Sequence, residues 1–87
     1  MMHIVSLVEI EVGRECAVWQ FAGGFAFTRR IEAMGIRLGT KLVKVSGSCF
    51  GGPVIVRAGN VQLALGHGMA SKIAVQVETD AEGDLDA

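Results

Sequence analysis

The sequence predicts a mainly β fold: a small closed or partly closed barrel of five short strands with two short helical segments. Three observations indicate it. Short runs of β-branched and aromatic residues alternate with turns, 12 of the 87 residues are glycine, and only one stretch has clear helical spacing. With 51% apolar and 20% charged residues, the chain has the composition of a folded domain. Barrel closure would leave no long unpaired strand edges, which matters in so small a sheet.

The first strand is expected at residues 15–21 (ECAVWQF), which are rich in β-favouring types and are followed by Gly23-Gly24. Residues 1–13 precede it as a short strand or loop laid across the core. Both faces of the 15–21 segment carry apolar side chains, so the pattern leaves open which face is buried.

One amphipathic helix is predicted between the first two strands, in the segment 28–40 (TRRIEAMGIRLGT). Its apolar face has the spacing i, i+4 and i+7: Phe27, Ile31 and Met34. Gly35 is expected to end the helix in the left-handed conformation, which glycine adopts without a Cβ penalty. Ile36 would then fold back onto the last helical turn.

The remaining strands are predicted along residues 41–77. The second strand is 41–46 (KLVKVS), followed by the glycine-rich loop 47–53 (GSCFGGP). Residues 54–58 and 61–65 flank Gly59-Asn60, a two-residue turn typical of a β-hairpin. Residues 66–71 (GHGMAS) form a short helical turn before the last strand, 73–77, in which apolar residues alternate strictly.

Charge divides the chain into a basic domain, residues 1–77, and an acidic tail, residues 78–87. The domain carries four acidic and eight basic residues, whereas the last ten residues carry five acids and no base. We expect one barrel domain at 1–77 and a disordered tail at 78–87. Uncharged runs are shorter than the about 20 residues of a membrane helix, so a cytoplasmic protein is expected.

Four segments in fixed order carry a family resemblance: Gly13, residues 29–40 (RRIEAMGIRLGT), Gly51-Gly52-Pro53, and residues 63–75 (LALGHGMASKIAV). Together they resemble the FeoA family, the small cytosolic component of the bacterial ferrous-iron transport system. The resemblance implies an SH3-like barrel and a non-enzymatic accessory role. In that role the module binds and modulates the cytosolic, GTPase-like region of the membrane ferrous-iron transporter, and so lies at the inner membrane only through its partner.

Two surfaces are predicted to bind this partner. The first is the helix with its ends: Arg29, Arg30, Glu32 and Arg37. The second is the central loop: Phe50, Gly52 and Pro53. Lys41 and Lys44 on the following strand are expected to extend the arginines into one positive surface, which suits an acidic partner or the anionic inner leaflet. An ordinary solvated face is the alternative interpretation.

A metal-responsive regulatory module is an alternative function, because the same barrel also resembles the C-terminal domain of iron-dependent repressors. Fe²⁺ or Zn²⁺ would be held by imidazole or thiolate ligands, and the candidates are His3, Cys16, Cys49 and His67. None of them lies at a recognised ligand spacing from another, so no cofactor is predicted with an assigned site. A site shared between two copies, and homo-oligomerisation in general, stay open.

Two further functions are weighed and not expected. Catalysis by Cys49 or Ser48 with His67 would need a third group that orients the base, and no motif supplies one. Nucleic-acid binding would need exposed aromatic residues for base stacking, and only Trp19, Phe25 and Phe50 are candidates. Cys16 is expected as a small core residue, with both thiols reduced; a single Cys16–Cys49 bridge is the alternative.

Overall fold

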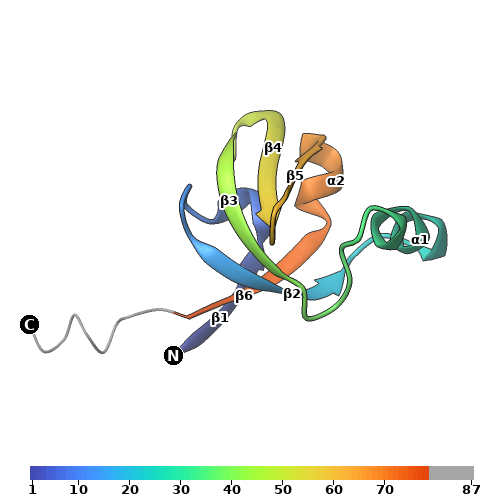
Figure 1. The fold of residues 1–87 in the computed structure, drawn as a ribbon, viewed down its shortest axis with the longest axis horizontal. Helices are drawn as coiled ribbons and strands as arrows, with labels where there is room; N and C mark the ends of the chain where they lie inside the picture. Colours follow the sequence, from blue (N-terminus) through green and yellow to red (C-terminus); the bar gives the residue numbers. More distant parts are fainter. Residues whose placement is uncertain (79–87) are drawn as a thin grey trace, which may run out of the picture.

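The computed structural model describes residues 1–78, and the predicted acidic tail lies outside the described residues from position 79 onward. Six strands form one antiparallel sheet in the order β1-β6-β2-β3-β4-β5 (Figure 1). The strands are β1 Met2–Ser6, β2 Glu15–Phe21, β3 Lys41–Ser48, β4 Gly51–Ala58, β5 Val61–Leu65 and β6 Ile73–Glu78. The helices are the 3₁₀ turn η1 Leu7–Glu9, α1 Phe25–Ala33 and α2 His67–Ser71. The mainly β prediction is confirmed.

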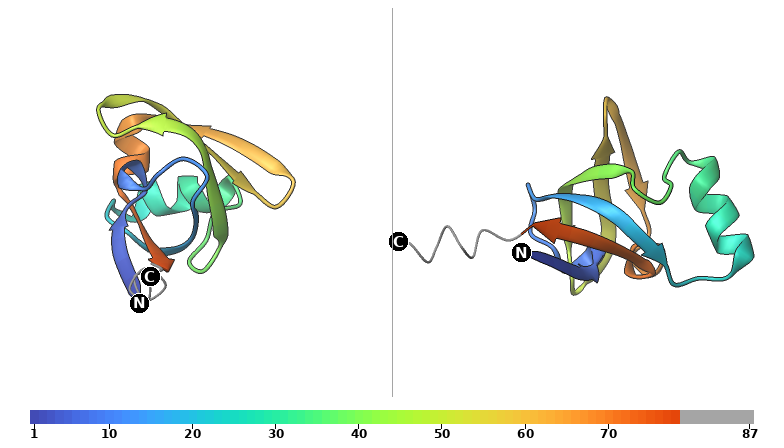
Figure 2. Two further views of the ribbon diagram at one scale, coloured as in Figure 1. Left: turned by 90° about the vertical axis from the view of Figure 1, so that its left-hand side faces the viewer. Right: turned by 90° about the horizontal axis from the view of Figure 1, so that it is seen from below.

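The sheet has one strand more than predicted, because the N-terminal segment is a true strand. β1 pairs with β6 from Met2↔Glu78 to Ser6↔Ala74. β1 and β5 are the two ends of the strand order, and the sheet curves strongly (Figures 1 and 2), so it is a partly closed barrel. β6 reaches Glu78, one residue beyond the predicted domain boundary.

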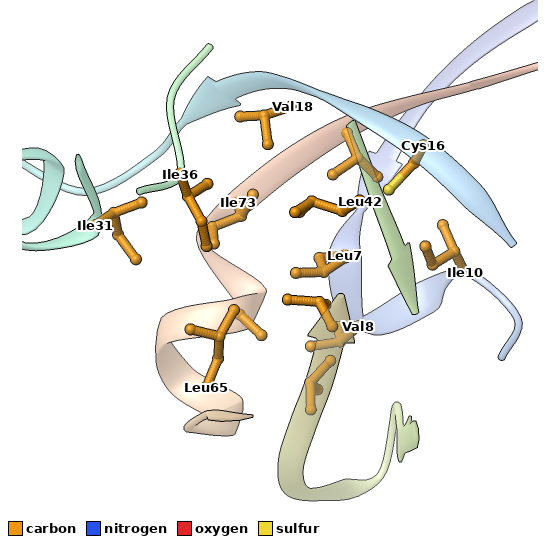
Figure 3. Close-up of a cluster of buried hydrophobic side chains, with 14 of the residues drawn as sticks. Leu7, Val8, Ile10, Cys16, Val18, Ile31, Ile36, Leu42, Leu65 and Ile73 are labelled. Carbon is orange, nitrogen blue, oxygen red and sulfur yellow. The ribbon is translucent and has the colours of Figure 1, made fainter. Parts of the chain in front are cut away.

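The core lies inside this curved sheet and extends toward α1 (Figure 3). Ile31 and Ile36, from α1 and the turn after it, occupy one end of the cluster, and Cys16 and Ile10 occupy the other. Ile31 and Ile36 are fully buried, so the predicted helix face does reach the core. Phe27 and Met34 are only partly buried against it, and α1 stands off to one side of the barrel (Figures 1 and 2).

The end of α1 has the geometry that its sequence predicts. Gly35 has φ +95°, the N–H of Gly35 donates to the carbonyl of Glu32 at 2.9 Å, and the N–H of Ile36 donates to the carbonyl of Ile31 at 3.2 Å. These two bonds are the paired hydrogen bonds of a Schellman cap. The helix begins earlier than predicted, at Phe25, so the segment before Thr28 belongs to it.

A β-bulge at Trp19 resolves the ambiguous face of β2. The β2–β6 register shifts between Val18 and Gln20, so Val18 and Phe21 both face the inside although they are three residues apart. Trp19 is the extra residue and lies outside, half-exposed.

The prediction that Lys44 belongs to an exposed positive surface is wrong. β3 alternates, and Leu42 and Lys44 both face the core; the side chain of Lys44 is 1% exposed. Its ammonium donates to the carbonyls of Val8 at 3.0 Å and Ile10 at 2.8 Å. Lys44 therefore ties β3 to the segment after β1, whereas Lys41 is exposed as predicted.

Candidate functional site: two exposed surfaces

The central loop predicted at residues 47–53 is the tip of the β3–β4 hairpin. The strands continue through Ser48 and from Gly51, which pair with each other, so only Cys49 and Phe50 form the turn. The alternation of apolar and polar side chains does not reveal this extension of the strands, because three of the added residues are glycines and have no side chain. One of them, Gly52, has φ +82°, a conformation that favours glycine, which explains why a glycine precedes Pro53.

Phe50 is the most exposed large apolar side chain of the described residues, with 95% of its surface accessible. Its backbone is held in place. The N–H of Phe50 donates to Ser48 Oγ at 3.0 Å, and Nε2 of His67, at the start of α2, lies 3.3 Å from the carbonyl oxygen of Cys49. The hairpin tip thus presents an apolar ring on a braced turn, with Gly52 and Pro53 exposed beside it.

The second surface is the α1 end, which we define by six exposed side chains: Trp19, Phe25, Arg29, Arg30, Arg37 and Leu38. The predicted contact residue Glu32 is also exposed, on the flank of α1. The Arg29 guanidinium lies over the ring of Phe25, 5.6 Å from its centroid. Within residues 1–78, none of the three arginines forms a salt bridge, so their charges are available to an external anion.

Three members of this surface lie outside the predicted partner contact: Trp19 and Phe25, which the sequence indicates only as candidate exposed aromatic residues, and Leu38. A helix that starts at residue 25 places Phe25 four positions before Arg29 and on the same outward face, so a correct start would have indicated it. The backbone segments that carry Trp19 and Leu38 are adjacent, because the N–H of Gly39 donates to the carbonyl of Val18 at 2.8 Å. That long-range pairing leaves no local signal in the sequence.

The four candidate metal ligands are dispersed. His3 lies on β1, and Cys16 is buried in the core. The His67 ring contacts the backbone carbonyl of Cys49, which is not the thiol that would bind a metal. Among the described residues, no three His, Cys, Asp or Glu side chains gather in a way that could hold an ion.

The two thiols are free and differ in environment. Cys49 is exposed at the hairpin tip and Cys16, on β2, is buried in the core; both are free, so the alternative of a Cys16–Cys49 bridge is wrong. Burial, with a smaller contribution from the charge of Glu15, raises the pKa of the Cys16 thiol to about 11, and Lys44 acts in the opposite direction. Cys16 is therefore a protonated core residue at neutral pH.

An open groove of about 330 Å³ lies between η1 and the end of β6, away from both surfaces. Its floor is apolar, formed by Val5, Ile10 and Val77, and its rim carries His3, Glu9, Glu11 and Arg14. Arg14 is engaged there, since its guanidinium donates to the carbonyl of Glu78 at 2.7 Å. No helix within residues 1–78 has the length and hydropathy needed to cross a bilayer.

Fold and surfaces together define a small β-barrel module with exposed aromatic and basic side chains at the hairpin tip and the α1 end. A family model described as the FeoA domain matches residues 5–77. The chain belongs to the FeoA family, which confirms the resemblance found in its sequence.

Relatives agree with this assignment. The chain is 36% identical over 70 residues to a Methanocaldococcus jannaschii protein named Fe(2+) transport protein A, and the match covers 80% of this chain and 79% of the relative. Among solved structures it is similar to a FeoA-like protein from Clostridium acetobutylicum, with a TM-score of 0.76 and 26% identity over 91% of this chain and 92% of that one. A FeoA protein from Chlorobium tepidum has a TM-score of 0.75 and 25% identity, over 86% of this chain and 71% of that one.

A manganese-dependent transcriptional repressor shares the fold with a TM-score of 0.78. Identity is 20%, and the match covers 90% of this chain but 44% of the repressor. At this identity the likeness shows the fold alone. The predicted SH3-like barrel class is confirmed by the FeoA structures.

Proposed function

We propose that the chain is a non-enzymatic accessory protein of ferrous-iron uptake that binds the cytosolic, GTPase-like region of the membrane ferrous-iron transporter. Membership of the FeoA family and the name of the Methanocaldococcus relative support the link to ferrous iron. The proposed location is the cytoplasm, at the inner membrane next to the partner.

The exposure of Phe50 carries the proposal. An apolar ring that is 95% exposed gains free energy when a partner covers it, and aromatic anchors often dominate protein interfaces. The turn beneath it is already ordered by Ser48 and His67, so binding orders little additional backbone. We assign Phe50, Gly52 and Pro53 to the contact with the transporter.

The α1 end is the second proposed contact, through Arg29, Arg30, Glu32 and Arg37. Its arginines form no salt bridges within residues 1–78 and suit an anionic surface. The structure adds three exposed apolar side chains on α1 and the segments that flank it, and the ring of one of them, Phe25, lies under Arg29; a purely ionic contact would not need them.

We propose no reaction at the hairpin tip. The ring of His67 is directed to the carbonyl of Cys49, so its nitrogen is engaged with the backbone. A nucleophile needs its base within hydrogen-bond reach, and this arrangement supports bracing of the turn instead.

Binding of the purified cytosolic region of the transporter, measured by calorimetry, tests the proposal. Phe50→Ser is expected to weaken binding at least about tenfold, because hot-spot aromatics contribute about 2 kcal/mol or more. Val61→Ser is the matched control, since Val61 is also an exposed apolar side chain but lies on β5. Absence of binding by the unmodified chain, or equal weakening by the two variants, would contradict the proposal.

A further inference from the structure

Three large apolar side chains are exposed on α1 and on the segments that lead into and out of it. The exposed fractions are 51% for Trp19, 77% for Phe25 and 62% for Leu38. Single exposed apolar residues are common on proteins, but several at one end of a domain this small indicate a contact surface. Neither the groove beside η1 nor a smaller one near Met2 and Glu15 is lined by these residues. They project from β2, α1 and the turn before β3 rather than enclose a cavity.

Positive charge is concentrated at the same end. Arg29, Arg30 and Arg37 are joined there by Lys72, whose ammonium lies 5.7 Å from the centroid of the Phe27 ring. Glu32 is the one acid on α1. The other described acids, Glu9, Glu11, Glu15 and Glu78, lie where β2 begins and β6 ends, at the opposite end of both strands. The charge distribution therefore orients the molecule, with the α1 end toward an anionic surface.

The contact between Arg29 and Phe25 combines positive charge with exposed apolar surface. The guanidinium lies over the exposed ring, so a cation and an apolar group reach the same point of an external surface. Interfacial helices on membranes combine basic residues with Trp, Phe and Leu in this way. Trp also favours the level of the lipid headgroups.

We propose that the α1 end binds an anionic lipid surface, with Trp19, Phe25 and Leu38 entering the headgroup layer and Arg29, Arg30 and Arg37 contacting lipid phosphates. A bilayer fits better than an acidic protein segment because α1, which carries Phe25, projects from the barrel (Figure 2), and neither groove is lined by the three apolar side chains. The inference deepens the proposed function, on which it rests for its setting: a chain held at the transporter by its hairpin tip would lie against the surrounding lipid through α1.

Vesicle binding tests this inference without the transporter. Trp19 is the chain's one tryptophan, so its fluorescence reports directly on the α1 end. With vesicles containing about 30% phosphatidylglycerol in phosphatidylcholine, we expect co-sedimentation and a blue shift of Trp19 emission; pure phosphatidylcholine vesicles should give neither. Raising the salt concentration should weaken binding, since exposed charges are screened.

Matched variants assign the surface. Arg30→Glu should weaken vesicle binding about tenfold or more. Arg57→Glu, the same charge change at an exposed position of β4, should change it less than about twofold. Phe25→Ser should also weaken binding, whereas Phe50→Ser should not. Unchanged circular dichroism confirms that each variant is folded.

The inference is overturned if the unmodified chain does not bind anionic vesicles, or if it binds them without a change in Trp19 emission. It is equally overturned if Arg57→Glu weakens vesicle binding as much as Arg30→Glu. It is also overturned if Arg30→Glu abolishes binding to the lipid-free transporter region while no vesicle binding occurs. That result would assign the α1 end to an acidic protein surface. Failure with vesicles leaves the Phe50 experiment unaffected, so the two proposals fail separately.

Discussion

Lys44 is the residue whose position most affects the interpretation of this chain. Its ammonium is buried and donates to two backbone carbonyls, those of Val8 and Ile10, more than 30 residues earlier in the chain. Within residues 1–78 no buried side-chain nitrogen or oxygen lacks a hydrogen bond. A buried cation is tolerated only when it is well hydrogen-bonded, so Lys44 fixes the path of the segment after β1.

Lys44→Met keeps the aliphatic stem and removes the donor, leaving the carbonyls of Val8 and Ile10 without it. We expect the free energy of unfolding to fall by about 1–3 kcal/mol, because the gain from no longer burying a charge offsets only part of the loss. Lys41→Met on the exposed face of the same strand should change it by less than about 0.5 kcal/mol. Urea denaturation of both variants measures the difference; equal stability of the two would contradict the structural role of Lys44.

Cys16 makes the free energy of unfolding depend on pH, and the direction of that dependence follows from its raised pKa. Its thiol pKa is raised from 9.0 to about 11 in the folded state, so above pH 9 the unfolded chain releases this proton and the folded chain retains it. The folded state then loses stability as pH rises from about 9 to about 11, by roughly 2–3 kcal/mol from this group.

Urea denaturation at pH 7.5 and at about pH 10.5 checks this prediction. Cys16→Ala should lower stability at both pH values through lost packing, but it should reduce the difference between them. Cys49→Ala, at the exposed thiol, should leave that difference unchanged. The same difference in both variants would argue against an ionisation effect of Cys16.

At the scale of elements, α1 is a short helix whose C-terminal cap is determined locally. Gly35 combines φ +95° with open space around the position of a Cβ atom, so the cost of a side chain there is backbone strain and not collision. Ile31 and Ile36 then anchor the helix to the core.

Gly35→Ala should therefore lower the free energy of unfolding by about 1–2 kcal/mol. Gly68→Ala in α2 is the control, because Gly68 also has open space around it but does not have a positive φ. It should be neutral or stabilising by up to about 1 kcal/mol. Thermal unfolding followed by circular dichroism measures both, and a cost at Gly68 equal to that at Gly35 would refute the strain argument.

Features set by neighbouring residues could be predicted from the sequence, and those set by distant pairing could not. The Gly35 cap, the hairpin at Gly59-Asn60 and the exposure of Phe50 depend on local turn chemistry, and the structure agrees with each. The burial of Lys44 depends on contact with residues 8–10, and the inward position of Phe21 depends on a bulge against β6. One inserted residue reverses the face of every residue that follows it, which alternation cannot reveal.

For the candidate surfaces, the sequence located the arginines and the loop tip but missed the apolar half of the α1 end. Phe25 was missed because the helix was expected to begin three residues later. The segments of Leu38 and Trp19 are brought together by long-range backbone hydrogen bonds of Val18 with Gly39 and Thr40. The partner roles of all these residues stay predictions that binding experiments decide.

At the scale of the whole molecule, the two surfaces lie on different sides of the barrel (Figure 1). The hairpin tip is the turn between β3 and β4, and α1 projects beyond the end of β2. A partner that covers Phe50 therefore leaves the α1 end available for a second contact. This separation lets a barrel of fewer than 80 described residues hold two different surfaces at once.

The most direct test of the central claim, docking through the hairpin tip, is an NMR titration of the ¹⁵N-labelled chain with the unlabelled cytosolic region of the transporter. We predict that amide signals of residues 48–53 and of His67 shift or broaden first, because His67 braces the same turn. Amides around Val61 on β5 should remain unchanged. No perturbation, or perturbation confined to the groove around Glu9, Glu11 and Arg14, would contradict the claim.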